Sequence, residues 1–303
     1  GIVRLKVSLD ANLDGQPEAV ATTPAWMFSR ETFAKGTRSF SMPLEQSELY
    51  VGTILQVEGG QSLRLAAASD LSFEGAAVLE VLNGAHEGDH FEVISAGDSV
   101  VMTASTVPAD LAGARVALRR VWRLDQLLPV DVFSAGTSES TSDRVLRYDV
   151  AANDFVPAWP RAENWTGEDG LQLMLHSGEA LLVQTRTQDV SIILAGQLPL
   201  SGAALKSADG TRFIGSRRAS DASPAGLGLL PEAGFTAAAD PVSATRLRLW
   251  KADSGGSESG YDSYYLHLSP TGSLWLGEGA AASADLGEDG FLLPFHGFFL
   301  VQP

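Results

Sequence analysis

The sequence predicts an all-β protein, with a small barrel-like insert and two repeated β-sandwich-like units. Three observations lead to this prediction: short runs of alternating apolar and polar residues recur along the chain, turn residues separate them, and one series of motifs occurs twice. No segment sustains the 3.6-residue period of a long helix. Strands of about five or six residues between regular turns are typical of small antiparallel barrels and sandwiches.

The repeated series begins with Leu-Leu-Pro, at 127–129 and again at 229–231. In each copy an arginine, Arg144 or Arg246, lies fifteen positions after the proline, and a Gly-Glu-Asp-Gly motif follows further on. The copies close with related apolar segments, 171–184 and 291–302, which both end in Val-Gln. Three matches in the same order indicate a duplicated structural unit. Between arginine and Gly-Glu-Asp-Gly the second copy is 18 residues longer (41 against 23), and much of the excess is a polar loop at 253–260.

Four parts follow from these patterns. We expect N-terminal strands at 1–48 that pair with the repeats, a barrel-like β domain at 49–118, a first sandwich repeat at 119–210 and a second at 211–303. The barrel prediction rests on a series of brief apolar or alternating runs separated by turn residues such as Asn83-Gly84. These runs lie at 49–57, 62–67, 77–82, 90–95 and 99–104. The helix candidates are short, at 108–112, 124–128 and 223–230.

Composition and charge argue against nucleic-acid binding and against membrane insertion. The 303 residues carry a net charge of −16, and such a field repels phosphate backbones and anionic membranes. No apolar run approaches the roughly 18 residues of a membrane helix. The chain has no cysteine, so disulfides are excluded. A strand-like segment follows Gly1 directly, from which we expect that a signal peptide has been removed and that the protein is extracellular or lies on the outer cell surface.

Six motifs occur in a fixed order along the chain: GIVRLKV at 1–7, SFSMPL at 39–44, LNGAHEGDHFEVIS at 82–95, the first Leu-Leu-Pro, RVLRYD at 144–149 and HSGEALLVQ at 176–184. This series resembles that of a family of uncharacterised exported β-rich proteins known chiefly from Verrucomicrobia. The resemblance spans nearly the whole chain, but its motifs are loose patterns of glycine and apolar residues. It implies an exported β-rich protein and no catalytic residue.

Two segments have the spacing of metal sites. The oxygen-bearing side chains of Asp10, Asn12, Asp14 and Glu18 match the first part of a calcium loop, but Ala21 stands where the bidentate glutamate belongs, so the alternatives are weak calcium binding and a plain turn. His86-Glu87-Gly88-Asp89-His90 has the His-Glu-x-x-His spacing of zinc proteases. Gly88 and the β-type residues that follow favour a hairpin turn over the helix that zinc binding requires, and we expect no zinc here.

No catalytic residue stands out. His176 and His296 hold equivalent positions in the two repeats, each before the closing turn, which suggests a shared structural hydrogen bond. Gly97-Asp98-Ser99 lies in a predicted turn. Aromatic side chains on or beside the repeat loops are candidates for stacking on a glycan. They are Trp159, Trp165, Tyr261, Tyr264 and Trp275.

We therefore predict a non-enzymatic structural protein of the cell surface that forms a filament or oligomer by strand exchange, with a carbohydrate-binding or adhesive module as the alternative. The first repeat continues into an apolar strand at 190–195, whereas the second stops at Pro303, so the second is expected to be one strand short. The N-terminal strand has the length and alternation to fill that edge, in its own chain or in a neighbour. Its apolar residues are Ile2, Val3, Leu5, Val7 and Leu9.

Overall fold

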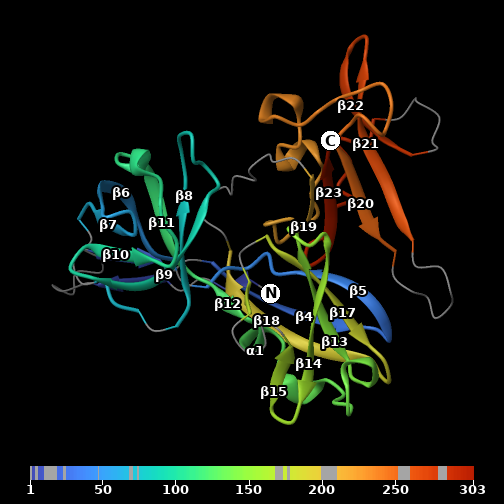
Figure 1. The fold of residues 1–303 in the computed structure, drawn as a ribbon, viewed down its shortest axis with the longest axis horizontal. Coiled ribbons are helices and arrows are strands. Elements are labelled where there is room, and N and C mark those ends of the chain that lie inside the picture. The colour runs from blue at the N-terminus through green and yellow to red at the C-terminus, as the bar shows by residue number, and fades with distance from the viewer. Residues whose placement is uncertain are drawn as a thin grey trace.

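The computed structural model is all-β: two five-stranded sheets, a three-stranded sheet and a closed barrel dominate the fold (Figure 1). It describes residues 25–46, 48–67, 71–73, 75–167, 173–175, 178–198, 210–251, 260–278 and 285–303, together with the backbone of strands at 2–3, 6–9 and 19–22. The barrel forms one side of the molecule and the two repeats form the other (Figure 1). The predicted fold class is confirmed.

The first repeat is an antiparallel sheet in the order β15-β14-β13-β17-β5. Its strands are β5 (Gly36–Ser41), β13 (Arg144–Asp149), β14 (Asp154–Arg161), β15 (Asn164–Gly167) and β17 (Ala180–Thr185). Strand alternation gives the sheet two apolar faces. Val145 and Val183 are fully buried on one face, and Leu146 and Leu182 pack on the other.

The second repeat has the same order when it is read from the other edge, β22-β21-β20-β23-β19. Its strands are β19 (Gly210–Gly215), β20 (Arg246–Trp250), β21 (Tyr261–Ser269), β22 (Gly272–Gly277) and β23 (Gly297–Gln302). Each strand has its counterpart at the same place in the first sheet. Most of the polar loop predicted at 253–260 lies outside the described residues.

The second repeat is not one strand short. Its edge next to β23 is occupied by β19, just as β5 occupies the edge next to β17. Both edge strands begin with Gly-Thr-Arg, at 36–38 and 210–212, and both glycines have a positive φ, 120° and 97°. The expected vacancy is therefore wrong, because the strand that fills it precedes the repeated motifs in the chain.

The closing strands β17 and β23 are equivalent in the structure, but their alignment is shifted by one residue from the one that their shared Val-Gln suggests. Val145 pairs with Val183, and Leu247, at the equivalent position of the second repeat, pairs with Leu300. Val183 thus corresponds to Leu300, and aligning it with Val301 would turn it to the opposite face of the sheet. The pattern of buried residues fixes this register, because Val183 and Leu300 both point into the outer core of their repeat.

A three-stranded sheet, β1-β4-β18, covers the outer face of the first repeat. It consists of β1 (Ile2–Val3), β4 (Trp26–Phe33) and β18 (Val190–Gln197), and β2 (Lys6–Leu9) pairs separately with β3 (Ala19–Thr22). Ile2 and Val3 lie opposite Met27 and Trp26 of the same chain. The N-terminal strand thus pairs with β4 and not with the second repeat.

The two repeats pack on each other through their inner faces. Ala180 and Leu182 of the first sheet meet Phe213 and Phe299 of the second, in a cluster with several further aromatic rings. The outer faces have separate cores that contain equivalent tryptophans. Trp165 donates its indole N–H to the carbonyl of Leu128 at 2.8 Å, and Trp275 donates to Leu229 at 3.0 Å. Each tryptophan thereby fixes a Leu-Leu-Pro segment against its sheet.

The barrel closes in the order β10-β7-β6-β11-β8-β9. Its strands are β6 (Glu48–Glu58), β7 (Ser62–Leu65), β8 (Ala77–Val81), β9 (His90–Gly97), β10 (Val100–Thr103) and β11 (Arg115–Arg120). Inward-facing aliphatic side chains such as Ile54, Leu79 and Leu118 fill it. Full closure removes the open strand edges that would otherwise attract other chains.

The remaining elements are short. Two-residue strands β12 (Trp122–Arg123) and β16 (Met174–Leu175) pair with each other. The helical segments are α1 (Leu124–Leu127) and the 3-10 turns η1 (Ala109–Leu111), η2 (Val130–Val132), η3 (Glu139–Thr141), η5 (Ala225–Leu227) and η6 (Pro231–Ala233). Within the described residues, no helix has the length and apolar character needed to cross a membrane.

Candidate functional site

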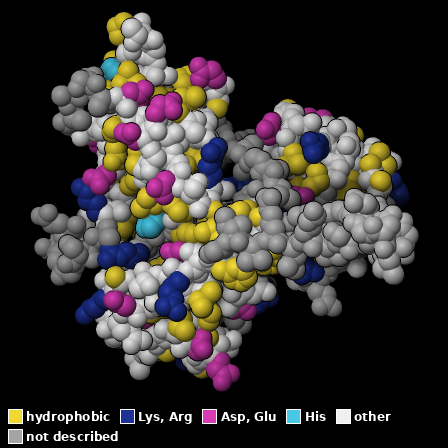
Figure 2. Space-filling model, turned by 180° about the vertical axis from the view of Figure 1, so that it is seen from behind, with side chains coloured by type: hydrophobic (Ala, Val, Ile, Leu, Met, Phe, Trp, Pro, Cys, Tyr) yellow, Lys and Arg dark blue, Asp and Glu magenta, His cyan; other side chains and the backbone are white. Residues whose placement is uncertain are grey.

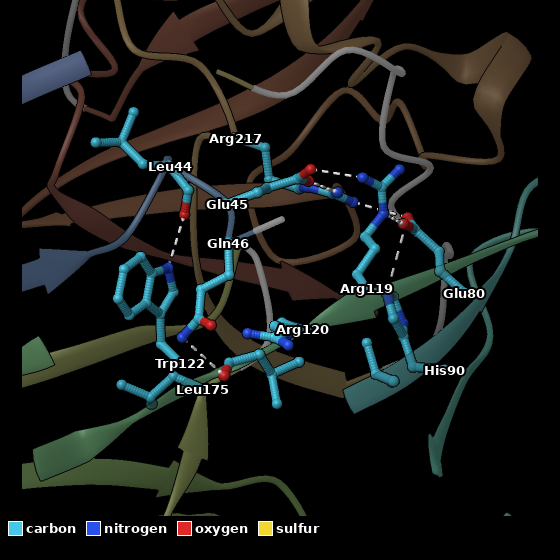
Figure 3. Close-up of a pocket in the computed structure, with 12 residues that line it drawn as sticks. Leu44, Glu45, Gln46, Glu80, His90, Arg119, Arg120, Trp122, Leu175 and Arg217 are labelled. Carbon is cyan, nitrogen blue, oxygen red and sulfur yellow. Dashed lines mark hydrogen bonds and ion pairs between the residues drawn. The ribbon is translucent and has the colours of Figure 1, made fainter. Parts of the chain in front are cut away.

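A cluster of charged side chains lies at the base of the barrel, where the chain enters and leaves it (Figure 3). Glu45 lies on the segment between β5 and the barrel, and Glu48 begins β6. Glu80 comes from β8 and Arg119 from β11, next to the exit. Arg217 reaches the cluster from the segment after β19 of the second repeat. We call these five residues the charged junction, because they join three parts of the fold.

Arg119 binds three carboxylates at once. Its Nη1 donates to Glu45 Oε2 at 2.5 Å and to Glu48 Oε2 at 2.9 Å, and its Nε donates to Glu80 Oε2 at 2.8 Å. Arg217 completes the ring: its Nη2 donates to Glu45 Oε1 at 2.5 Å and its Nη1 to Glu80 Oε1 at 2.8 Å. Glu45 and Glu80 therefore each bridge both arginines, as the dashed lines in Figure 3 show in part.

Four of the five side chains of the charged junction are almost completely buried, and the fifth, Glu48, is 24% exposed. The exposed fraction of the side chain is 1% for Glu80, 4% for Arg119, 6% for Glu45 and 9% for Arg217. Its three carboxylates and two guanidinium groups give a net charge of 2 − 3 = −1. Buried charges are tolerated only when they are paired and hydrogen-bonded, and here alternating signs meet that condition.

The pKa shifts follow from burial and ion pairing. Burial disfavours ionisation of Glu80, but Arg217 and Arg119 together outweigh it and hold the pKa of Glu80 below its ordinary value. Burial, together with the neighbouring Glu45 and Glu80, raises the pKa of Glu48, and the ion pair with Arg119 does not outweigh them. Burial alone would lower the pKa of Arg217, but Glu80 and Glu45 raise it. The junction therefore keeps Glu80 and Arg217 charged.

His90 lies beside the junction, with Nε2 at 3.8 Å from Glu80 Oε1. The cavity at this place has a volume of about 20 Å³, too small for an organic substrate. The carboxylates of Glu45 and Glu80 are fully engaged by arginines, so neither is available as a general base. The arrangement suits mechanical coupling: it fixes the barrel to the connector at Glu45 and to the second repeat through Arg217.

The His-Glu-x-x-His motif lies on the turn between β8 and β9 and not on a helix. His86 pairs through Nδ1 with Asp89 Oδ2 and through Nε2 with Asp110 Oδ1, both at 3.1 Å, whereas His90 faces Glu80. The hydrogen bond to Asp89 contributes most to raising the pKa of His86. Within the described residues, no three His, Asp or Glu side chains are placed to hold one metal ion.

Other predicted site residues fall in different places. The calcium candidates Asp10, Asn12, Asp14 and Glu18 lie outside the described residues, as do Leu5 and His176. Val7 and Leu9 belong to β2. His296 contacts the carbonyl of Pro294 through Nδ1 at 3.0 Å. Asp98 and Ser99 form the tight turn between β9 and β10, where both have a positive φ.

The aromatic candidates separate into core and surface residues. Trp165 and Trp275 are 2% and 1% exposed, so they are core side chains and cannot stack on a glycan. Tyr264 is half-buried and stacks on Phe291. Tyr261 is 37% exposed, but its ring packs against Trp250 and Phe299. Trp159 lines an open surface groove beside β14.

One strand edge in the described part of the chain is long and open. The backbone N–H and C=O of Gln197 pair with those of Glu45 on the side of β18 away from β4. Because the N–H and C=O groups of successive residues alternate between the two sides of a strand, those of Ser191, Ile193 and Ala195 point to the same side as those of Gln197. None of these three makes a backbone hydrogen bond to a described residue there. The side chain of Ile193 is 70% exposed, and hydrophobic side chains gather across the middle of the face seen in Figure 2.

Sequence reasoning missed the charged junction. A signal was present, because Glu80 interrupts the apolar run Val78-Leu79-Glu80-Val81 and Arg119 directly follows the apolar residues 116–118 of β11. Charged residues in such strands are rarely buried without partners. The sequence could not show that those partners come from three separate segments.

Comparisons with protein-family models, with curated proteins and with solved structures found no match to this chain.

Proposed function

We propose that the protein is a non-enzymatic structural protein of the cell surface that self-associates by adding a second copy at the open edge of β18. The observation that carries this proposal is that edge, with exposed Ile193 and backbone groups that have no partner among the described residues. Unpaired N–H and C=O groups on a sheet edge are a template for another strand.

The sequence of β18 offers no protection against such pairing. Val190–Gln197 contains no charged residue and no proline, which are the usual devices that block a sheet edge. The outer edge of β22 in the second repeat is covered at Trp275, whose backbone N–H donates to Asp285 Oδ1 at 3.1 Å and whose carbonyl accepts from Leu286 N–H at 2.9 Å. Self-association at β18 is therefore favoured over the edge of the second repeat.

A second copy of β18 is the occupant that fits best. Antiparallel pairing centred on Ile193 would place Ser191 opposite Ala195 of the other copy, so that each of the three residues exchanges backbone hydrogen bonds. Such an interface uses the same surface on both partners, so it closes as a dimer. The two exposed Ile193 side chains would flank the two-fold axis on the same face of the joined sheet, and neither copy brings a charge to the new strand pair.

The charged junction supports a structural role. It links the barrel to the second repeat through the ion pair of Glu80 with Arg217, and its carboxylates are engaged in ion pairs. The location on the cell surface rests on the sequence expectation of an exported chain and is part of the proposal.

Sedimentation velocity over a range of protein concentrations tests self-association. The protein should form a dimer as concentration rises, and Ile193→Lys, which puts two charges next to each other at the symmetric edge, should stay monomeric. Leu268→Lys is the matched control, because Leu268 is also an exposed apolar residue on a strand, at 55%. A monomer at all concentrations, or equal dimerisation of the two variants, would reject the β18 edge.

A further inference from the structure

We infer that the groove beside β14 is a binding site for a neutral oligosaccharide. The groove has a volume of about 660 Å³ and lies at the end of β14 that β15 leaves unpaired, since β15 pairs only with residues 158–161. Its lining combines apolar and acidic groups: Glu139, Asp154, Phe155, Pro157, Trp159 and Thr166 are among the residues that form it.

Trp159 is the central residue of the inferred site. Four of the six tryptophans, at 122, 165, 250 and 275, donate the indole N–H to a backbone carbonyl within the protein. The indole N–H of Trp159 makes no hydrogen bond to a described residue, and the residue is partly exposed. An indole with an accessible surface and an unused N–H donor has the two properties that a sugar ring requires, an apolar surface for its C–H groups and a partner for a hydroxyl.

The polar groups around Trp159 favour hydroxyl donors. Glu139 Oε1 accepts a hydrogen bond from Arg144 Nη1, and Asp154 Oδ1 accepts one from the N–H of Phe155. The second oxygen of each carboxylate has no hydrogen-bond partner among the described residues. The hydroxyl of Thr166 bonds no described residue and lies on the strand position opposite Trp159. Carboxylate oxygens accept hydrogen bonds from sugar hydroxyls, and they repel an anionic ligand.

Charge restricts the class of ligand, and backbone geometry sets the wall of the groove. The net charge of −16 and the two acidic groove residues disfavour an acidic polysaccharide. Gly167 has a φ of 141°, and a Cβ there would lie 2.4 Å from the carbonyl oxygen of Pro157. Glycine therefore lets β14 and β15 approach closely at the groove wall, and this fixes the strand that carries Thr166 next to Trp159.

Calorimetry with defined oligosaccharides tests the inference. The probes are hexamers of β-1,4-linked glucose, β-1,4-linked xylose and β-1,4-linked mannose, with a hexamer of galacturonic acid as the anionic comparison. At least one neutral hexamer should bind, and the galacturonate should not. No binding of any neutral hexamer at millimolar concentration, or stronger binding of galacturonate, would overturn the inference.

Variants then locate the site. Trp159→Leu should weaken binding by at least about tenfold, and Trp159→Phe, which keeps a ring but loses the N–H, should lie between it and the unaltered protein. Tyr261→Leu removes an aromatic residue outside the groove and should bind normally. If Trp159→Leu does not fold, Trp159→Phe decides the question, and undiminished binding in Trp159→Phe would overturn the role of the indole N–H. Ile193→Lys should bind as the unaltered protein does, because the groove and the β18 edge are separate.

Discussion

Replacing Arg119 by methionine should destabilise the protein by about 3–5 kcal/mol, because it leaves buried carboxylates without one of their two cations. Arg119 contacts Glu45, Glu48 and Glu80 at 2.5, 2.9 and 2.8 Å, and its side chain is 4% exposed. At an effective dielectric constant of 20, a pair of unit charges 4 Å apart interacts by about 4 kcal/mol. Arg217 still neutralises part of the charge, and protonation of Glu48 relieves more, so the net loss stays well below the sum over three pairs.

Denaturant unfolding followed by two probes measures this loss. All six tryptophans lie outside the barrel strands, at 26, 122, 159, 165, 250 and 275, so their fluorescence reports on the repeats, while circular dichroism reports on the whole chain. Arg64→Met is the control: Arg64 is also a barrel arginine paired with a glutamate, but the two side chains are 45% and 36% exposed, and such pairs contribute about 0–1 kcal/mol. If Arg119→Met costs no more than Arg64→Met, the charged junction is not a stabilising coupling.

Three further predictions follow from individual residues. The pKa of Glu80 is lower in the folded state than its ordinary value of 4.5, so its contribution to stability is present above that pH and is lost as pH falls through the folded pKa; acid unfolding of Glu80→Gln should accordingly lack this part of the pH dependence. Because Asp89 contributes most to the raised pKa of His86, Asp89→Asn should lower that pKa in an NMR titration, and an unchanged titration would disprove the pairing. Gly167→Ala should cost more than about 1 kcal/mol in thermal unfolding and more than Gly228→Ala, because Gly228 also has a positive φ but has open space around its Cβ position.

The sequence predicted the elements that depend on local pattern. Alternation and turn residues located five of the six barrel strands within a few residues, as at β9, predicted at 90–95 and found at His90–Gly97, but they did not locate β11. The repeated Leu-Leu-Pro segments and their arginine strands also occupy equivalent places, with Phe133 and Phe235 each buried in the outer core of its repeat. These predictions were correct because the sequence pattern that determines each element lies within a few residues of it.

Prediction failed where distant segments meet. The strand that completes the second sheet, β19, lies before the repeated motifs, and its only sequence signal is the short Gly-Thr-Arg shared with β5. Trp165 and Trp275 were predicted to be exposed glycan contacts because they lie beside loops. Each is buried instead, and its indole N–H donates to a backbone carbonyl from a distant segment. The charged junction required contacts between Glu45, Glu80 and Arg217, which are separated by up to 172 residues in the chain.

Amide hydrogen exchange along β18 tests the proposed self-association most directly. The N–H groups of Ile192 and Leu194 point toward β4 and should be protected at every protein concentration. Those of Ser191, Ile193 and Ala195 point to the open edge, so they should exchange fast in dilute protein and become protected only at concentrations where the dimer forms. If the amides at 191, 193 and 195 exchange equally fast in monomer and dimer, the second copy does not pair with β18, and the proposed assembly is wrong.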